Sequence, residues 1–330
     1  TSFSRTHRDE KMAKLTGLHP FYQKEPGILR RALTSVFAQK FNDFDVIVVD
    51  DESPFPPDGD LIAFSEDEQA RVRVVRQDNA GPGGARNTGL DSVSAATDFV
   101  AFLDSDDIWT PDHLALAHAA MTGFSADCYF ASITGGEAFY YHFGVEDLAR
   151  TETVIRLADD PLLIEIPDLT QVMLKNWSFL HLSSMVIGRP VFERIRFDAA
   201  LRLAAEDVLF FCDCVLAARR VVLSGAVGAV RGEGVNIFHG IDNDSPQFLH
   251  QQFNTWVALD RLETRFAERP AEVASLRSYK QTARQQALWS QARRVKHRKL
   301  PQFDMLARWA MRDPRILASA VGLAVGKFSR

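Results

Sequence analysis

Apolar runs alternate with helical patterns along the first third of the chain. Three short runs rich in β-branched residues have the length and composition of buried parallel strands. They are residues 44–50, 71–77 and 98–104. Apolar residues at helical spacing fill neighbouring segments, residues 25–39, 81–96 and 110–121, the last with Thr110 as its expected N-cap. This alternation predicts an α/β fold in which helices flank a mostly parallel central sheet.

The pattern changes after about residue 125. Aromatic strand-like runs occupy residues 127–133 and 137–143, an irregular acidic stretch covers 147–168, and an apolar helix begins near residue 204. The final third has an almost entirely helical pattern. We therefore expect a tag or disordered extension (1–11), a main domain (12–240) whose halves meet near residue 125, and a helical, basic C-terminal region (241–330).

Composition supports a globular protein, since 46% of the 330 residues are hydrophobic. No uncharged apolar run reaches about 18 residues, and the N-terminus lacks the apolar stretch of a secretion signal, so a cytosolic location is expected. We interpret Cys128, Cys212 and Cys214 as reduced core thiols. The net charge of −5 hides an asymmetry, because residues 280–330 hold twelve Lys or Arg against two acidic residues.

Residues 79–87, "NAGPGGARN", are rich in glycine but match neither common phosphate-binding loop. From Gly81 the spacing is Gly-x-Gly-x-x-Arg, which lacks the closing glycine of the dinucleotide motif, and no Gly-Lys-Ser/Thr follows. These glycines could let the backbone approach a phosphate or sugar at a helix start, or they could serve only as turn residues.

Carboxylates gather where predicted strands end. Asp50 and Asp51 end one strand, and Asp104, Asp106 and Asp107 follow another. Because ligands of parallel sheets sit at the carboxyl ends of strands, both clusters could face one cleft. On an extended chain Asp104 and Asp106 would share a side, where Mg²⁺ or Mn²⁺ would relieve their repulsion and bridge to a nucleotide diphosphate. A solvated loop is the alternative.

Four segments taken together, in this order and spacing, resemble the inverting family 2 glycosyltransferases. They are "VVDDES" (48–53), "NAGPGGARNTGL" (79–90), "FLDSDDIWTPDHL" (102–114) and "AAEDVLFFCDCV" (204–215). The resemblance covers roughly residues 15 to 240. "PFYQKEPGILRRAL" and "GEGVNIFHG" are similar in particular to bacterial glucosyltransferases that assemble succinoglycan-type exopolysaccharide.

The resemblance implies a GT-A type fold, with residues 12–125 binding the nucleotide sugar and 126–240 the acceptor. It implies inverting transfer of a sugar, glucose by the narrower resemblance, from a UDP-sugar to a lipid-linked oligosaccharide, with Mn²⁺ or Mg²⁺ as cofactor. The enzyme would lie in the cytoplasm, peripheral at the inner face of the plasma membrane. A metal-dependent nucleotidyltransferase and a non-catalytic sugar-nucleotide-binding module remain alternatives.

The same resemblance assigns roles to individual residues. Asp207 would be the catalytic base, Glu206 an acceptor ligand or a first-turn carboxylate, and His181 would lie beside the sugar and acceptor. The residues implied to bind the nucleotide and its diphosphate are Pro20, Tyr22, Glu25, Asp51, Arg86, Asp104 and Ser105. Asp104 and Asp106 would form the metal pair, with Asp106 as the direct ligand, and Glu233 or His239 could complete the site.

Two segments depart from the family pattern. The first strand, residues 15–22, carries Gly17 and His19 where β-branched residues are normal. Residues 1–11 precede Met12, which is a plausible first residue of the protein. Later, Arg231, Gly232 and Glu233 stand where many relatives carry Arg-x-His.

The basic tail suggests an anionic partner. Residues 291–300 supply cations, and Trp309 and a short apolar helix follow, a combination suited to a membrane interface. Nucleic acid is disfavoured because stacking aromatics are not interleaved with the cations. A solvated helical face, packing against the main domain and a homodimer are the alternatives.

Overall fold

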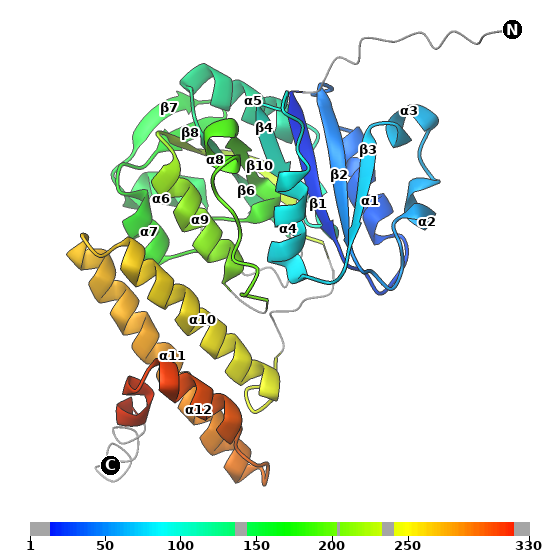
Figure 1. Ribbon diagram of the computed structural model, residues 1–330. Coiled ribbons are helices and arrows are strands. Elements are labelled where there is room, and N and C mark those ends of the chain that lie inside the picture. Colours follow the sequence, from blue (N-terminus) through cyan, green and yellow to red (C-terminus); the bar gives the residue numbers. More distant parts are fainter. Residues whose placement is uncertain (1–13, 136–143, 203–204, 233–240, 320–330) are drawn as a thin grey trace, which may run out of the picture. The chain divides into compact units, whose positions relative to one another are not determined.

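The computed structural model describes residues 14–135, 144–202, 205–232 and 241–319 (Figure 1). The chain divides into two units, each assembled from separate segments. The first, here the sheet unit, comprises Thr1–Pro167, Ser178–Arg196 and Ala217–Gly234, and the second, the helical unit, comprises Asp168–Trp177, Phe197–Leu216 and Val235–Arg330. Two short segments thus group with the C-terminal helices, whereas the predicted boundaries follow chain order. Residues 1–11, the predicted extension, lie outside the described residues.

The sheet unit is built on one mixed sheet of ten strands in the order β3-β2-β1-β4-β9-β6-β10-β8-β7, with β5 paired to β10. Its strands are β1 (Leu15–Phe21), β2 (Phe44–Asp51), β3 (Val72–Gln77), β4 (Phe99–Phe102), β5 (Ile108–Trp109), β6 (Cys128–Thr134), β7 (Ile155–Asp159), β8 (Leu162–Glu165), β9 (Met185–Gly188) and β10 (Val221–Val230). The pairings run β1 through β4, β6, β7 and β10 in one direction and β5, β8 and β9 in the other. The mostly parallel sheet predicted from the alternation is therefore confirmed.

Helices cover both faces of this sheet. The helices of the sheet unit are α1 (Ile28–Phe37), α2 (Asp58–Leu61), α3 (Glu66–Gln69), α4 (Gly81–Asp91), α5 (His113–Phe124), α6 (Val145–Thr151), α8 (Arg189–Phe192) and the 3₁₀ turn η1 (Leu182–Ser184). Along β2, Val46 and Val48 join the core cluster that contains α1 and α5, while Ile47 and Val49 pack with Ala85 of α4. Burial on both faces explains why β2 is an uninterrupted apolar run.

Strand β1 is central despite its glycine and histidine. Gly17 packs against the rings of His19 and Trp109, which a Cβ at this position would meet at 3.4 and 3.5 Å, ordinary contact distances. His19 is fully buried, and its ring centroid lies 5.8 Å from that of Trp109. Burial lowers the pKa of His19 to about 3, so the ring is neutral. β1 is therefore a continuous strand despite its unusual composition, and its histidine packs beside Trp109.

Two local predictions are wrong. Thr110 does not cap α5: its N-cap is Asp112, and the Thr110 hydroxyl instead donates to the carbonyl of Val227 at 2.6 Å, tying this segment to β10. Residues 147–168 are not irregular, because they contain most of α6 and the antiparallel hairpin of β7 and β8. The hairpin lies at the edge of the sheet and carries acidic side chains, so the sequence pattern did not predict its strands. The run at 137–143 lies outside the described residues.

The helical unit consists of α7 (Leu169–Lys175), α9 (Glu206–Ala217), α10 (Pro246–Arg265), α11 (Pro270–Lys296) and α12 (Phe303–Arg312). Figure 1 shows α10 and α11 as a long antiparallel pair. Trp309 of α12 is fully buried, with ring centroids 5.4 Å from Phe253 and 6.1 Å from Trp256 of α10. The predicted helical C-terminal region is confirmed, and no helix among the described residues is both long and apolar enough to cross a bilayer. The three cysteines are free and buried, as predicted.

Candidate active site

The carboxyl ends of β1, β2 and β4 meet at one edge of the sheet. Phe21 at the end of β1 pairs in register with Asp50 of β2, and Leu18 pairs with Phe102 at the end of β4. The segments that follow these strands therefore emerge side by side. This arrangement places the two acidic clusters at the same edge, as the sequence predicts.

The segment from Asp104 to Asp107 is a tight turn. The backbone N–H of Asp107 donates to the carbonyl of Asp104 at 3.1 Å, and Ser105 and Asp106 form the turn between them. The expectation of an extended chain with alternate side chains on one side is therefore wrong. A hydrogen-bonded turn brings the three carboxylates of this segment together by another route.

Arg86 of α4 forms an ion pair with Asp104, with 2.6 Å between Nη2 and Oδ1. The side chain of Arg86 is 5% exposed and that of Asp104 is 28% exposed. Burial raises the pKa of Asp104, but attraction to Arg86, His181 and Arg231 outweighs burial and holds the pKa below its usual value. The predicted place of Arg86 near the nucleotide or its diphosphate stays a prediction.

Asp106 and Asp107 concentrate negative charge beside this pair. Burial and repulsion by Asp107 and Asp104 raise the pKa of Asp106 to about 7. Burial and repulsion by Asp104 raise the pKa of Asp107 to about 6. Three crowded carboxylates favour a cation with a hard-oxygen preference, so the donor set fits Mg²⁺ or Mn²⁺.

The protein supplies only part of a metal shell in the region that the structure covers. Within that region no three His, Cys, Asp or Glu side chains are arranged to hold one ion. Glu233 and His239, predicted to complete the site, lie outside the described residues. A cation on the aspartate turn would thus take its remaining ligands from substrate, water or residues outside that region.

Ser183 of η1 links the turn to His181, and sequence reasoning missed it. Its hydroxyl donates to Oδ2 of Asp107 at 2.5 Å and accepts the backbone N–H of Asp104 at 3.1 Å. Its own backbone N–H donates to Nδ1 of His181 at 3.2 Å, and its carbonyl accepts the indole N–H of Trp109 at 2.7 Å. The only sequence signal was its position two residues after His181.

His181 is oriented by the same turn. Because Nδ1 accepts a hydrogen bond from Ser183, the neutral ring carries its proton on Nε2. Nδ1 also lies 3.9 Å from the Asp107 carboxylate. The structure therefore brings His181 to the aspartate turn.

Gly232 packs directly against the aspartate turn. A side chain at this position would collide with the backbone carbonyl of Asp106, and the Gly232 N–H donates to Oδ1 of Asp107 at 2.9 Å. The close backbone approach requires glycine. Arg231 adds positive charge near Asp104.

Residues after β1 reach the aspartate turn through Gln23. Its side-chain amide donates to the hydroxyl of Ser105 at 2.7 Å, and both groups are buried. Tyr22 is 41% exposed at this edge, and Glu25 is also exposed. Contacts of Pro20, Tyr22, Glu25 and Ser105 with a nucleotide stay predictions.

Asp51 joins β2 to the amino end of α4. Its Oδ1 accepts the side-chain amide of Gln77 at 2.6 Å and the N–H of Ala80 at 2.7 Å, and its Oδ2 accepts the N–H of Gly81 at 2.9 Å. A carboxylate has about four acceptor positions, so Oδ2 keeps capacity for one further donor. The predicted contact with uracil would use that position.

Glu206 and Asp207 open α9 in the helical unit. Both lie in its first turn and are partly exposed, and Oδ1 of Asp207 accepts the N–H of Val208 at 2.7 Å. A carboxylate at a helix start is favoured by the helix dipole whether or not it is catalytic. Their roles as base and acceptor ligand therefore stay predictions.

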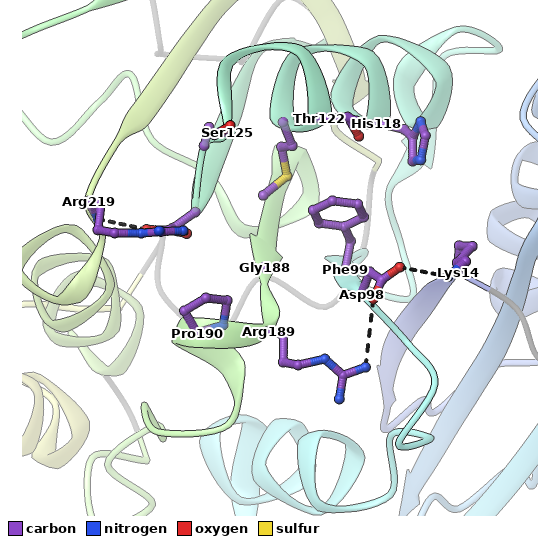
Figure 2. A pocket seen from close by; sticks show the side chains of 13 residues that line it. Lys14, Asp98, Phe99, His118, Thr122, Ser125, Gly188, Arg189, Pro190 and Arg219 are labelled. Carbon is purple, nitrogen blue, oxygen red and sulfur yellow. Dashed lines mark hydrogen bonds and ion pairs between the residues drawn. The ribbon is translucent and has the colours of Figure 1, made fainter.

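A hollow of about 390 Å³ lies at the opposite end of the strands (Figure 2). Lys14 precedes β1 and Asp98 precedes β4, so this hollow is at the amino ends of strands whose carboxyl ends carry the aspartates. Figure 2 shows Lys14 and Arg189 directed at Asp98. Arg189 also pairs with Glu193, so each of these charges has a partner, and the hollow is separate from the candidate site.

Fold and site together define an α/β enzyme with a charged, cation-compatible site at the carboxyl edge of its sheet. Residues 19–196 match the glycosyl transferase family 2, and the chain belongs to this family. It is a glycosyltransferase.

Individual relatives extend the match. The succinoglycan biosynthesis protein ExoW of Rhizobium meliloti is 69% identical over 319 residues, which cover 97% of this chain and 100% of ExoW. ExoO of the same organism, also a succinoglycan biosynthesis protein, is 28% identical over 304 residues, covering 89% of this chain and 75% of ExoO. The crystal structure of S. aureus TarS 1–349 in complex with UDP superposes with a TM-score of 0.52 and 19% identity, over 86% of this chain and 72% of that one. The TarS match confirms the GT-A type fold.

Proposed function

We propose that this protein is a metal-dependent, inverting glycosyltransferase that moves glucose from UDP-glucose to a lipid-linked oligosaccharide during succinoglycan-type exopolysaccharide synthesis. The name of ExoW supports the pathway, given 69% identity. Support for the donor comes from E. coli WfgD, named as a UDP-Glc:alpha-D-GlcNAc-diphosphoundecaprenol beta-1,3-glucosyltransferase. It is 34% identical over 103 residues, which cover 31% of this chain and 38% of WfgD.

The observation that carries the proposal is the Arg86–Asp104 ion pair beside Asp106 at the carboxyl edge of the sheet. A guanidinium next to crowded carboxylates offers donors for phosphate oxygens together with oxygen ligands for a cation. Pro20, Tyr22, Glu25 and Asp51 would line the uridine pocket, and Ser105 would lie beside the diphosphate. Nucleotide binding at this edge is the usual arrangement of open α/β sheets.

Asp104 and Asp106 would hold Mg²⁺ or Mn²⁺. When bound, such a cation neutralises charge on the departing UDP. Arg86 would hold Asp104 in place and share its positive charge with the diphosphate. Glu233 or His239 would supply a further ligand.

Asp207 would act as the general base and take the proton of the acceptor hydroxyl as that oxygen attacks the anomeric carbon. Attack opposite to the leaving UDP inverts the configuration at that carbon. Glu206 would bind the acceptor. His181, held by Ser183 with its proton on Nε2, would donate that N–H to the sugar or the acceptor.

An acceptor attached to a lipid carrier would place the enzyme at the cytoplasmic face of the plasma membrane. Peripheral attachment through the basic C-terminal helices fits that location, and a homodimer is compatible with it. No nucleic acid partner is part of the proposal.

The deciding experiment measures UDP release from a panel of UDP-sugars, with a lipid-linked acceptor extract, in the presence of Mn²⁺ and in excess EDTA. We expect the largest rate with UDP-glucose and near-complete loss in EDTA. Asp207→Asn should lower kcat by at least about a hundredfold while UDP binding is retained. Asp91→Asn, which alters a surface carboxylate paired with Arg196, is the matched control and should be fully active.

Other outcomes exclude the proposal. Release of pyrophosphate from a nucleoside triphosphate, without UDP release from any sugar nucleotide, would indicate a nucleotidyltransferase. Binding of UDP with no turnover under any metal condition would indicate a non-catalytic module.

A further inference from the structure

We propose that the loop between α11 and α12, together with the outer side of α12, forms a surface that binds anionic lipid bilayers. This surface is defined here as Val295, Lys296, Arg298, Leu300, Phe303, Arg308, Met311 and Arg312. It lies wholly in the helical unit, and its argument does not depend on the chemistry of the aspartate turn.

Helix α12 has an apolar row on the side that faces away from its own core. Met305 and Trp309 are buried, four residues apart, against the unit's interior. Phe303 and Met311 are 68% and 80% exposed, and eight residues separate them, which places both on one side of the helix. Large apolar side chains at such exposure have no packing role in the folded unit, so they are available to a partner.

Cations border that apolar row. Arg308 is exposed and lies three residues before Met311, on the neighbouring side of α12. Arg312 is also exposed, at the border toward α10, three residues after buried Trp309, and the exposed Asp304 lies in the first turn beside Phe303. Neither arginine forms an ion pair with an acidic side chain in the part of the chain that the structure covers. Arg312 instead lies close enough to Arg261 to disfavour the charged form of that group. Asp304 is the one acidic residue of α12, so Arg308, Arg312 and the loop cations leave a net positive charge here.

The preceding loop repeats the same combination. Leu300 is 82% exposed and Val295 is 59% exposed, and Lys296 and Arg298 are exposed between them. Buried Asp244 holds the loop, because it accepts bonds from Nζ of Lys299 at 2.8 Å and pairs with Nδ1 of His297 at 2.6 Å. The loop that carries Leu300 is thus held in place by these contacts.

Exposed apolar side chains beside a net positive charge match an anionic bilayer interface. The apolar groups enter the headgroup region, and each cation near the surface adds attraction to acidic lipid. A second copy of the chain would bring like charges together. Nucleic acid would need several stacking aromatics, and Phe303 is the single aromatic side chain of this surface. Trp309, expected from the sequence to reach the interface, is buried, so that assignment is wrong.

The test is co-sedimentation of the full chain with two kinds of vesicle, pure phosphatidylcholine and phosphatidylcholine mixed with phosphatidylglycerol. We expect binding to the acidic vesicles that weakens as salt rises, and little binding to the neutral ones. Arg308→Glu with Arg312→Glu should lower the affinity by at least about tenfold. Arg73→Glu with Arg194→Glu makes the same change in net charge on exposed arginines of the sheet unit, and it should leave binding unchanged.

A second pair of substitutions distinguishes the contribution of the apolar side chains from that of the charges. Phe303→Ser with Met311→Ser should weaken binding at all salt concentrations while leaving the far-UV circular dichroism unchanged. Equal binding to both vesicle types, or wild-type binding by both variant pairs, would overturn the proposal. So would a concentration-dependent dimer that only the serine pair disrupts, or selective binding of single-stranded RNA. Vesicle binding is measured without turnover, so its outcome is separate from that of the UDP-release assay.

Discussion

The Ser183 hydroxyl donates a 2.5 Å hydrogen bond to the Asp107 carboxylate, and it does so from a side chain with no solvent exposure. The same oxygen accepts the backbone N–H of Asp104. Ser183 therefore fixes both ends of the aspartate turn from η1, a segment distant in sequence. A short bond to an ionised carboxylate in a buried setting is among the stronger hydrogen bonds in proteins.

Replacing Ser183 by alanine should misplace the turn. We expect kcat to fall by about tenfold or more and the Mn²⁺ concentration for half-maximal rate to rise, because small displacements of bound groups are costly in catalysis. The free energy of unfolding should fall by about 1–3 kcal/mol, the cost of leaving a buried charged partner unsatisfied. UDP release titrated with Mn²⁺ measures the first effect and urea denaturation the second.

Ser184→Ala is the matched control for this variant. Ser184 is equally buried, but its hydroxyl donates to the backbone carbonyl of His181. It should lose about 1 kcal/mol of stability with an unchanged metal requirement. If both variants shifted the metal titration equally, Ser183 would have no special positioning role.

Removing only one partner of the Arg86–Asp104 ion pair should lower the stability of the folded protein. Arg86→Met leaves Asp104 without its partner and should lower the free energy of unfolding by about 3 kcal/mol. It should also raise KM for the sugar nucleotide. Arg156→Met is the control, since the Arg156–Asp159 pair lies on an exposed surface and should contribute at most about 1 kcal/mol.

A double variant, Arg86→Met with Asp104→Asn, distinguishes charge from catalysis. Removal of both charges should restore much of the stability lost by Arg86→Met, but not the activity. Restored activity would contradict the proposed roles of these residues. Urea denaturation and the UDP-release assay provide the two readouts.

The parallel half of the sheet could be predicted because its strands are buried on both faces. Val46 to Val49 of β2 face two cores, and that environment produces an apolar run visible in the sequence. The insertion of β9 between β4 and β6 could not be predicted, because pairing between distant segments leaves no local signature.

The acidic residues of the site could also be predicted, because three aspartates directly after a buried strand are unusual. Their geometry could not, because the bond from the Asp107 N–H to the Asp104 carbonyl overrides the alternation of an extended chain. Ser183 was missed because a serine side chain carries no charge or periodicity that marks it. Its role depends on a fold that brings η1 to the end of β4.

Buried histidine should make the protein sensitive to mild acid. Burial among the rings of Trp109 and Tyr129 lowers the pKa of His113 from its ordinary value of 6.5 to about 3. Burial also raises the pKa of Tyr129, to about 12, so that group stays neutral here. Between those two His113 values the unfolded chain binds a proton that the folded chain does not, so stability falls as pH falls through this window.

His113→Leu should remove that component. Its free energy of unfolding should fall less steeply with decreasing pH than that of wild type, by about 1.4 kcal/mol per pH unit near pH 5. Urea denaturation between pH 4.5 and 7.5, about the range in which this group matters, measures the two slopes. The values at pH 7.5 give the baseline cost of the substitution itself, where the histidine is neutral in both states. Buried His19 contributes to the acid dependence of both proteins alike, so parallel curves would show that His113 adds nothing to it.

Trp309 should stabilise the helical unit rather than contact lipid. Trp309→Ala leaves a cavity against Phe253 and Trp256 and should lower the free energy of unfolding by about 3–5 kcal/mol, measured by urea denaturation with far-UV circular dichroism. Trp289, which is 50% exposed, is the matched control, and Trp289→Ala should cost less than about 1 kcal/mol. Trp309→Phe should recover most of the loss because it keeps an aromatic ring in the same space. If Trp309→Ala were as stable as wild type but failed to bind acidic vesicles, the indole would belong to the membrane surface and the packing of α12 described here would be wrong.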